Sequence, residues 1–221
     1  MTFKPTIAPL GDAALLVRLG DEIDPAINRR VHTLAALIRH APLDGVTETV
    51  PAYATLLIHY DPLILSYARV YEWLNAKLDQ INATEQRAPA YIEVPVRYGG
   101  EHGVDLQFVA DFHHRSVEEV VRIHSSRTYT IFMMGFTPGF PYMGKLDDAI
   151  VTPRLDVPRT HVHSGTVAIA GSQTGIYPID SPGGWRLIGH TSLRLFEPQS
   201  DSPFLFSPGD QVKFVVASLC L

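Results

Sequence analysis

Glycine is unevenly distributed along this chain of 221 residues. Nine of the 16 glycines, at positions 135, 139, 144, 165, 171, 175, 183, 184 and 189, fall within one quarter of the sequence. Glycine permits tight turns and close approach of one backbone to another, because it carries no side chain. The second half of the chain also contains four short β-rich runs: Tyr129 to Met134, Thr166 to Ala170, Ser192 to Phe196 and Gln211 to Val216. Short strands joined by frequent turns predict a closed or nearly closed β-barrel.

The first 85 residues have a different pattern, with two segments of helical period. Asp24 and Pro25 supply an N-cap and a proline at the first helical position, and the apolar residues after them recur every three or four positions. These residues are Ile27, Val31, Leu34 and Ile38. A second helix is predicted after Asp61 and Pro62, with an apolar face made of Ile64, Tyr67, Tyr71, Leu74 and Leu78.

Strand-like runs surround these helices, at Ala13 to Leu19, Thr47 to Val50 and Tyr53 to Tyr60. The order strand, helix, strand, strand, helix predicts an α+β unit of the ferredoxin-like kind, with the helices on one face of the sheet. The run Tyr91 to Val96 either closes this first unit or opens the second.

The polar stretch Asn82 to Pro89 resembles a linker, so we expect two domains, at residues 1–88 and 89–221. Two short helices are predicted early in the second domain. One begins near Asp105, and the other begins at Ser116, which with Glu119 has the spacing of a capping box.

Composition and charge exclude several classes of protein. The formal net charge of -5 argues against a general nucleic-acid binder, which needs a dominant basic surface. The single cysteine, Cys220, cannot form an internal disulfide and suits a reducing compartment. No stretch approaches the roughly 18 apolar residues of a membrane span, and the first residues lack the pattern of a signal peptide. We therefore expect a cytoplasmic globular protein.

Two local patterns suggest sites that we do not favour. Gly139 to Lys145 fits the first seven positions of a P-loop, but Leu146 stands where a serine or threonine would bind magnesium, and Pro141 lacks an N–H for phosphate. His161 and His163 would point to the same side of an extended chain and could bind one metal ion. Because no nearby histidine or cysteine completes a set of ligands, a pair of exposed or hydrogen-bonded histidines is the preferred interpretation and we expect no metal site.

Cationic side chains are the stronger signal, because they gather among the glycine-rich turns of an otherwise acidic chain. Arginine binds carboxylate or phosphate through two parallel hydrogen bonds, while glutamine and tyrosine can orient an amide. The candidate anion- and substrate-binding residues are Arg154, Arg159, Gln173, Tyr177, Arg186 and His190. The sequence contains no Gly-x-Ser-x-Gly, His-Glu-x-x-His or Gly-x-Gly-x-x-Gly motif, so no catalytic residue is assigned. These features predict a binding site on a barrel.

A long, ordered set of motifs resembles the KipI-like family, whose bacterial members are called the B subunit of 5-oxoprolinase or allophanate hydrolase subunit 1. The motifs are Phe136 to Gly144, Thr152 to Arg154, Pro158-Arg159, Val167 to Gly171, Gln173 to Pro178 and Pro182 to Thr191, with Val94 to Gly100 upstream and Pro208 to Asp210 downstream. Three positions depart from the family pattern, namely Arg97, His163 and Ser172.

The resemblance implies an N-terminal ferredoxin-like domain followed by a C-terminal cyclophilin-like barrel. It also implies one subunit of an enzyme that uses ATP and Mg²⁺, bound elsewhere in the complex, to cleave 5-oxo-L-proline to L-glutamate. The implied partners are the A and C subunits of 5-oxoprolinase, one of them KipA-like.

Other functions remain open on the same motifs. KipI itself inhibits a sporulation histidine kinase, so a regulatory binding protein is the main alternative. Relatives fused into urea carboxylase suggest a component of a urea or allophanate carboxyltransferase, and a free-standing prolyl isomerase rests on fold analogy alone.

Overall fold

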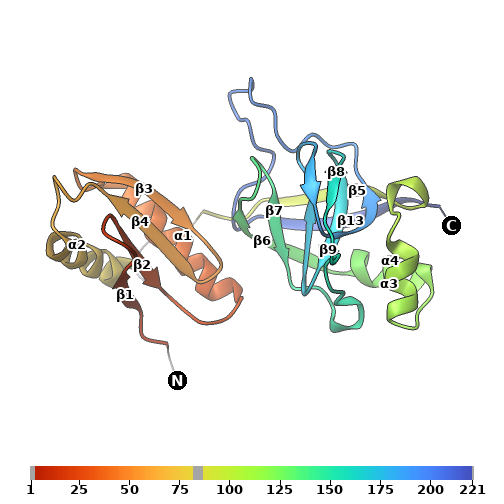
Figure 1. The fold of residues 1–221 in the computed structure, drawn as a ribbon, viewed down its shortest axis with the longest axis horizontal. Coiled ribbons are helices and arrows are strands. Elements are labelled where there is room, and N and C mark those ends of the chain that lie inside the picture. The colour runs from red at the N-terminus through yellow and green to blue at the C-terminus, as the bar shows by residue number, and fades with distance from the viewer. Residues whose placement is uncertain (1–2, 82–86, 221) are drawn as a thin grey trace. The chain divides into compact units, whose positions relative to one another are not determined.

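The computed structural model describes residues 3–81 and 87–220, and the chain forms two compact units, Met1–Ala88 and Pro89–Leu221 (Figure 1). Most of the predicted linker, Asn82 to Pro89, lies outside the described residues. That each unit folds on its own remains a prediction from the sequence.

The N-terminal unit is a four-stranded antiparallel sheet with two helices. Its elements are β1 (Thr6–Pro9), β2 (Ala14–Arg18), α1 (Pro25–His40), β3 (Val46–Pro51), β4 (Thr55–Tyr60) and α2 (Tyr67–Gln80). The strand order is β1-β2-β4-β3, and both helices lie on the same face of the sheet (Figure 1). The alternate residues Leu15, Val17, Leu56 and Ile58 share one buried cluster with the apolar sides of the helices, as the period of two in a strand requires.

Helix α1 begins where the sequence predicts. The Asp24 carboxylate accepts hydrogen bonds from the amides of Ala26 at 2.8 Å and Ile27 at 3.0 Å. These amides have no partner inside the helix, so the cap satisfies two donors of the first turn.

The predicted start of the second helix is wrong, and its predicted apolar face is right only at Leu74 and Leu78, which pack in the core. The Asp61 carboxylate instead accepts a hydrogen bond from the Leu63 amide at 2.8 Å and closes a turn, and the helix begins at Tyr67 with Ser66 as its N-cap. The predicted apolar period begins at Ile64, which lies before the helix. Tyr67 and Tyr71 are exposed, whereas the buried side carries Val70, Leu74 and Lys77.

The sheet also differs from the expected ferredoxin-like arrangement. In that arrangement a strand after the second helix would pair with the first strand of the split βαβ unit. Among the described residues, β1 takes this edge and pairs with β2, from Thr6 opposite Arg18 to Pro9 opposite Leu15. The strand that follows α2 belongs to the second unit.

The second unit contains a closed seven-stranded barrel, which confirms the predicted barrel. Its strands are β5 (Tyr91–Gly99), β6 (Thr128–Met134), β7 (Pro141–Gly144), β9 (Thr166–Ala170), β10 (Gln173–Ile176), β12 (Arg186–His190) and β13 (Gln211–Cys220). Their order is β10-β7-β6-β13-β5-β12-β9, and pairing of β9 with β10 closes the ring. Strand β13 lies between β5 and β6, parallel to β5 and antiparallel to β6.

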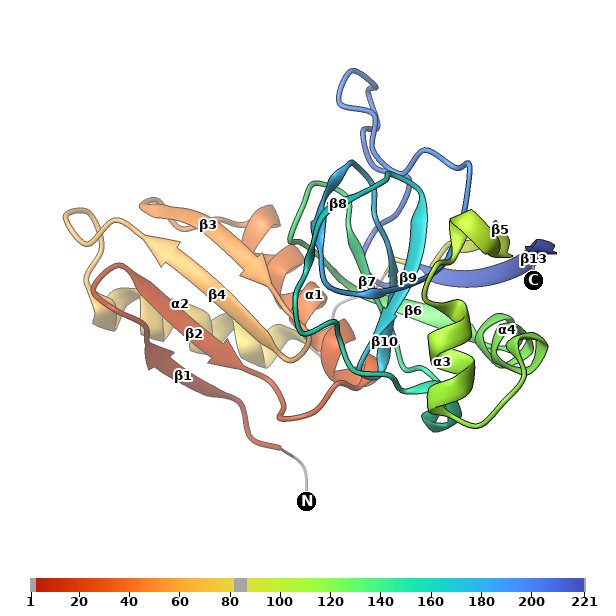
Figure 2. The same cartoon turned by 45° about the vertical axis from the view of Figure 1, so that its right-hand side comes forward.

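The remaining elements lie around this barrel. Helices α3 (Leu106–Phe112) and α4 (Val117–Ser126) pack beside it (Figures 1 and 2), and α4 has the predicted capping box between Ser116 and Glu119. Strands β8 (Arg159–Val162) and β11 (Ser181–Gly183) form a separate two-stranded sheet. The predicted strand Ser192 to Phe196 is wrong, because this segment makes only an isolated bridge between Phe196 and Phe204.

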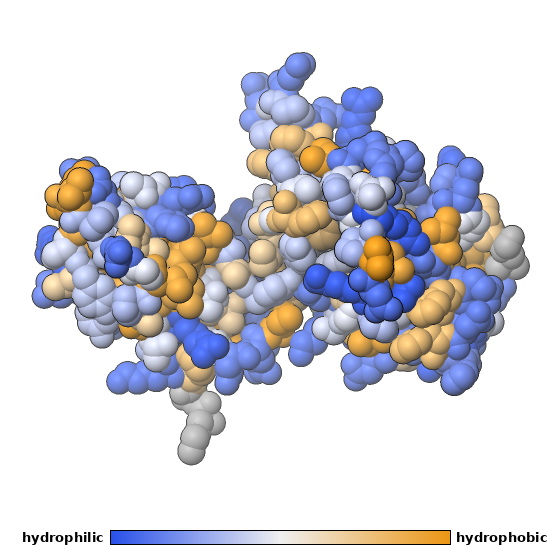
Figure 3. Space-filling model, in the orientation of Figure 1, coloured by the Kyte–Doolittle hydropathy of each residue, from blue (hydrophilic) through white to orange (hydrophobic). Residues whose placement is uncertain are grey.

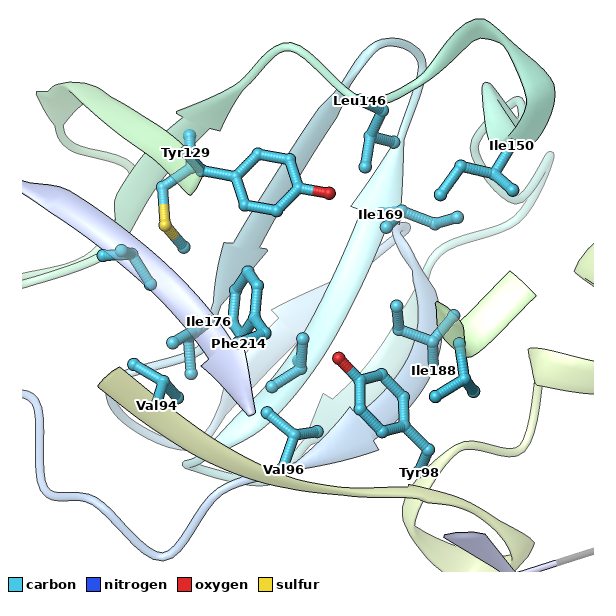
Figure 4. Packing of buried hydrophobic residues seen from close by; sticks show 14 of the residues in the cluster. Val94, Val96, Tyr98, Tyr129, Leu146, Ile150, Ile169, Ile176, Ile188 and Phe214 are labelled. Atoms are coloured by element: carbon cyan, nitrogen blue, oxygen red, sulfur yellow. The ribbon is translucent and has the colours of Figure 1, made fainter. Parts of the chain in front are cut away.

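The barrel interior combines apolar packing with one buried polar network. Figure 4 shows the rings of Tyr98 and Tyr129 pointing into the interior, near Phe214. Between them lies His124 of α4, which is fully buried. Its Nδ1 lies 2.8 Å from the Tyr98 hydroxyl, its Nε2 lies 2.9 Å from the Thr174 hydroxyl, and its backbone oxygen accepts a hydrogen bond from Tyr129 at 2.8 Å.

The network fixes the tautomer of His124. The Thr174 hydroxyl donates to the Ala168 carbonyl at 3.1 Å, so it accepts from His124 Nε2–H, and His124 Nδ1 accepts from Tyr98. Burial lowers the pKa of His124 to about 3, so the ring is neutral in this network.

The surface shows no strong segregation by hydropathy on the face in Figure 3, where hydrophobic residues are scattered among hydrophilic ones on both units. Within residues 3–81 and 87–220, no helix is long and apolar enough to cross a membrane.

Candidate functional site

One outer side of the barrel carries four aromatic rings in contact. Phe140 is central, with ring centroids 4.9 Å from Tyr142, 5.2 Å from Tyr177 and 5.3 Å from Trp185. We call these four residues the aromatic cluster. It packs on Ala168 and Ala170 of β9, whose neighbours Val167 and Ile169 point into the barrel interior. The alternation along β9 thus separates the barrel core from a second, outer core.

Two glycines are required where rings approach the backbone. A Cβ atom at Gly175 would lie 2.8 Å from Phe140, and one at Gly183 would lie 2.2 Å from the Tyr177 hydroxyl oxygen. Both distances are shorter than van der Waals contact, so any side chain here would displace a ring. The glycine density of the sequence therefore has a specific cause at these two positions.

Arg159 lies at the start of β8 and forms a partly buried ion pair with Asp105. Its Nη2 is 2.8 Å from Asp105 Oδ1, while Asp105 Oδ2 accepts the Leu187 amide at 2.7 Å. The other terminal nitrogen, Nη1, is buried and has no hydrogen-bond partner among the described residues. A buried charged donor without an acceptor is costly, so Nη1 is an unsatisfied group beside this ion pair.

Arg154 is exposed and extends over the aromatic cluster. Its guanidinium carbon lies 5.9 Å from the Trp185 ring centroid, at the range of a cation–π contact. Burial raises the pKa of Tyr177, an effect opposed by a hydrogen bond from the Trp185 backbone and by the positive charges of Arg154 and Arg159. Both arginines therefore act on the same phenol, which stays protonated at neutral pH.

Burial also raises the pKa of Tyr142, and the charge of Arg154 opposes this shift. Tyr142 is thus a second neutral phenol beside the same guanidinium. Two arginines and two phenols at the edge of an aromatic cluster can bind an anionic group together with a planar one.

Arg186 has a different environment. Its guanidinium stacks on Phe108 of α3 at 3.7 Å, and its Nε donates to the Pro153 carbonyl at 3.2 Å. These contacts connect α3 and the loop at Pro153 to β12, so Arg186 stabilises the packing of these segments.

Gln173 begins β10 and pairs with Ala170 and Gly144. The next residue, Thr174, bonds to His124 in the barrel interior, so alternation places Gln173 on the outer side, as it does Gly175. Gln173 therefore shares its face with the aromatic cluster.

His190 lies in a different group of residues, at the end of β12. Its Nε2 is 3.0 Å from the Ser164 carbonyl, and its ring stacks on His102 at 5.5 Å. Burial lowers the pKa of His190, the bond to Ser164 opposes this shift, and the charges of His102, Arg97 and His163 reinforce it. The residues selected from the sequence thus divide into a group at the aromatic cluster and His190, which lies among other histidines.

The two patterns that we did not favour have clear structures. Pro141–Gly144 is strand β7, paired with β6 and β10, so the residues that fit a P-loop pattern do not form a phosphate-binding loop. His161 and His163 do form the expected hydrogen bond, at 3.1 Å between Nε2 and Nδ1.

Two acidic residues near these side chains were missed. Asp105 holds Arg159, and Asp180 lies beside the two histidines. Each is distant in sequence from its partner, so no local spacing indicated either pair. A carboxylate at the start of a predicted helix was the available signal for Asp105.

Comparison with known proteins gives a consistent result. Residues 5–206 match the family described as "Carboxyltransferase domain, subdomain C and D". The chain is similar to the B subunit of 5-oxoprolinase of Bacillus subtilis, with 41% identity over 97% of this chain and 94% of that protein. It is 25% identical to urea amidolyase of Lachancea kluyveri over 97% of this chain, which corresponds to only 13% of that enzyme. Among solved structures, the protein TTHA0988 is 38% identical with a TM-score of 0.81, over 92% of this chain and 39% of that one.

Proposed function

Because the chain belongs to the family of 5-oxoprolinase B subunits, we propose that it is the B subunit of an ATP-dependent 5-oxoprolinase, which hydrolyses 5-oxo-L-proline to L-glutamate. The assignment rests on a similarity that covers nearly the full length of both proteins. At 41% identity, the match spans 97% of this chain and 94% of the Bacillus subtilis protein. The similarity to urea amidolyase reaches only a small part of that enzyme, so it supports a shared domain rather than a shared reaction.

The proposed reaction needs a site for an anion. The substrate carries a carboxylate next to a lactam, and activation by ATP would place a phosphate on the lactam oxygen. Arg159 has a buried donor without an acceptor among the described residues, and Arg154 is exposed over the Trp185 ring. The charges of both arginines act on the same phenol, Tyr177. Arginine is suited to both carboxylate and phosphate, because its planar fork matches their oxygen atoms.

The aromatic cluster supplies the other part of the proposed site. Tyr142 is partly buried and stays protonated, so its hydroxyl can donate to a carbonyl, while the buried rings of Tyr177 and Trp185 form an apolar wall beside it. Gln173 on the same face can bond to the ring amide. In the proposed reaction, water adds to the carbonyl carbon of the phosphorylated lactam, and the C–N bond breaks as the nitrogen gains a proton and leaves as an amine. A second water then hydrolyses the resulting acyl phosphate to the carboxylate and inorganic phosphate.

We assign nucleotide binding to the partner subunits, proposed to be the A and C subunits of 5-oxoprolinase. Four of the seven P-loop-like residues, Pro141–Gly144, form strand β7, and we assign no ATP contact to this chain. The active site would be composite, with this subunit contributing the anion-binding side. We also propose that the barrel is cyclophilin-like and that the N-terminal unit is a variant of the ferredoxin-like sandwich.

Reconstitution tests the assignment. The purified chain should produce no glutamate from 5-oxo-L-proline, ATP and Mg²⁺, whereas a mixture with both partner subunits should do so. Full activity of the partner pair without this chain would refute the proposal.

Substitution of Arg154 tests the site. Arg154→Ala removes an exposed cation from the edge of the aromatic cluster, so the fold should be unaffected. We expect activity to fall by about tenfold or more, the value of roughly 1.4 kcal/mol of lost transition-state stabilisation. Arg194→Ala is the matched control, because Arg194 is also exposed and its ion pair is with Glu197, three residues along the chain. Equal activity of the two variants would remove Arg154 from the site and leave the family assignment intact.

A further inference from the structure

The open end of the β8–β11 sheet brings three potential metal ligands together. His163 follows the last residue of β8, and Asp180 precedes the first residue of β11, so the pairing of Val162 with Ser181 brings them close. His161 lies two positions before His163, on the same side of the strand. The ligand atoms of the three side chains all lie within 4.8 Å of one another, and the residues are exposed.

Individual distances fit a small ion. His161 Nε2 is 3.1 Å from His163 Nδ1 and 3.3 Å from Asp180 Oδ2, and His163 Nδ1 is 3.6 Å from the same oxygen. A tetrahedral zinc ion with bonds of about 2.0–2.1 Å separates its ligands by about 3.3–3.4 Å. A triangle with the three measured sides has its centre about 1.9 Å from each corner, so an ion at zinc distance would sit just off its plane.

The carboxylate is held in the orientation that such an ion needs. Asp180 Oδ1 accepts the Ser164 amide at 2.8 Å, which leaves Oδ2 directed at the two imidazoles. The Ser164 hydroxyl donates to the Pro178 carbonyl at 2.9 Å, and the Gly165 amide donates to the Tyr177 carbonyl at 2.7 Å. These bonds join the turn after β8 to the turn before β11, so the ligands are positioned by the backbone. Outer hydrogen bonds of this kind orient ligands in known metal sites.

The chemistry of the donors selects among ions. Two imidazoles and one carboxylate suit Zn²⁺ and related transition metals, whereas Mg²⁺ and Ca²⁺ prefer oxygen ligands alone. His190 does not complete the set, because its Nε2–H is bonded to the Ser164 carbonyl. Three protein ligands leave one position for water or an anionic ligand.

We propose that His161, His163 and Asp180 form a Zn²⁺ site with one open coordination position. One of the two imidazole nitrogens now carries the hydrogen of their shared hydrogen bond. When Zn²⁺ binds, that ring takes its other tautomer, with the hydrogen on the nitrogen that does not bind the metal. The site is separate from the aromatic cluster and does not depend on the proposed function. The sequence indicated the two histidines as possible ligands but not the third ligand, because Asp180 comes 17 residues after His163.

Metal binding by the isolated full chain tests the proposal. The protein should carry no histidine tag, and Zn²⁺ is titrated calorimetrically while Co²⁺ serves as a visible-absorption probe of tetrahedral geometry. We expect one ion per chain and no comparable binding of Mg²⁺. Signals of the His161 and His163 rings should shift in NMR spectra on addition of Zn²⁺.

Three variants identify the ligands. His161→Gln, His163→Gln and Asp180→Asn should each weaken Zn²⁺ binding at least tenfold. Asp180→Asn retains an oxygen for the Ser164 amide, so it preserves the turn while removing the charged ligand. His40→Ala is the control, because His40 is an exposed histidine at the end of α1. Binding that does not saturate at one ion per chain, or that is equally strong in the three variants and the control, would overturn the proposal.

Discussion

Acidification from pH 7 to pH 5 should destabilise the barrel, most strongly through His124, whose pKa burial lowers furthest among the described histidines. This histidine is fully buried and neutral, and both of its ring nitrogens already have partners in Tyr98 and Thr174. Protonation would add a hydrogen to Nδ1, which now accepts from Tyr98, and would place a positive charge in the apolar interior. The folded state therefore resists a proton that the unfolded chain accepts.

The magnitude follows from the two pKa values. The folded pKa of His124 is about 3, whereas an unperturbed histidine has a pKa of about 6.5. Above pH 6.5 the ring is neutral in both states and its contribution is constant. Below pH 6.5 the unfolded state binds a proton and the folded state does not, so stability falls as the pH falls towards 3. At pH 5 the loss is about 2 kcal/mol, because each pH unit below 6.5 costs about 1.4 kcal/mol.

Two measurements are needed. NMR titration of the His124 ring in the folded protein should show no protonation near pH 6, in contrast to exposed histidines. Urea unfolding at pH 7 and pH 5 should then be followed through the fluorescence of Trp185 in a Trp73→Phe background, so that the signal reports on the barrel unit. His124→Gln should lose about 2 kcal/mol of the difference between the two pH values.

A His124 ring that titrates with a pKa near 6.5 while the protein stays folded would refute the predicted loss of stability. That result would mean that the interior accepts the charge or that the ring is not enclosed. The NMR titration uses the unsubstituted protein, so it tests the prediction even if the His124→Gln variant does not fold.

Three other substitutions have defined expectations. Lys145→Ala should leave the activity of the reconstituted complex nearly unchanged, and a loss of about a hundredfold would restore a nucleotide role for this segment. Ser116→Ala removes the cap that bonds to the Glu119 amide, and denaturant unfolding should show a loss of about 1 kcal/mol. Gly165→Ala places a Cβ atom 2.3 Å from the Thr191 carbonyl at a φ of +83°, so it should lower the thermal midpoint more than the Ser116 change, and an unchanged midpoint would contradict the geometry of this turn.

Local sequence signals predicted the elements that depend on local chemistry. The capped helix after Asp24 and the capping box at Ser116 were found because a cap and its partner lie within three residues. The strands β7, β10 and β12 were not predicted as strands, because each is short and contains a glycine, and β7 also contains a proline. They are strands because neighbouring strands supply their hydrogen bonds, and single-sequence patterns do not record such long-range pairing.

The candidate site shows the same limit. The cationic residues were visible as residue types, but their partners were not. The carboxylate that holds Arg159 comes from Asp105, 54 residues away, and the separation of His190 from the arginines follows from the path of β12. Which cations share a site is thus decided by topology.

The position of β13 has a consequence for synthesis of the protein on the ribosome. Because Gln211–Cys220 lies between β5 and β6, both of these strands have an unpaired edge until that segment leaves the exit tunnel. The nascent barrel therefore exposes two strand edges and part of its apolar interior while more than a hundred residues are added after β5. Chains that stall before residue 211 would be open sheets prone to pair with each other. Binding of a chaperone to the growing chain would be most useful during this interval, and the protein becomes closed against such pairing only with its last strand.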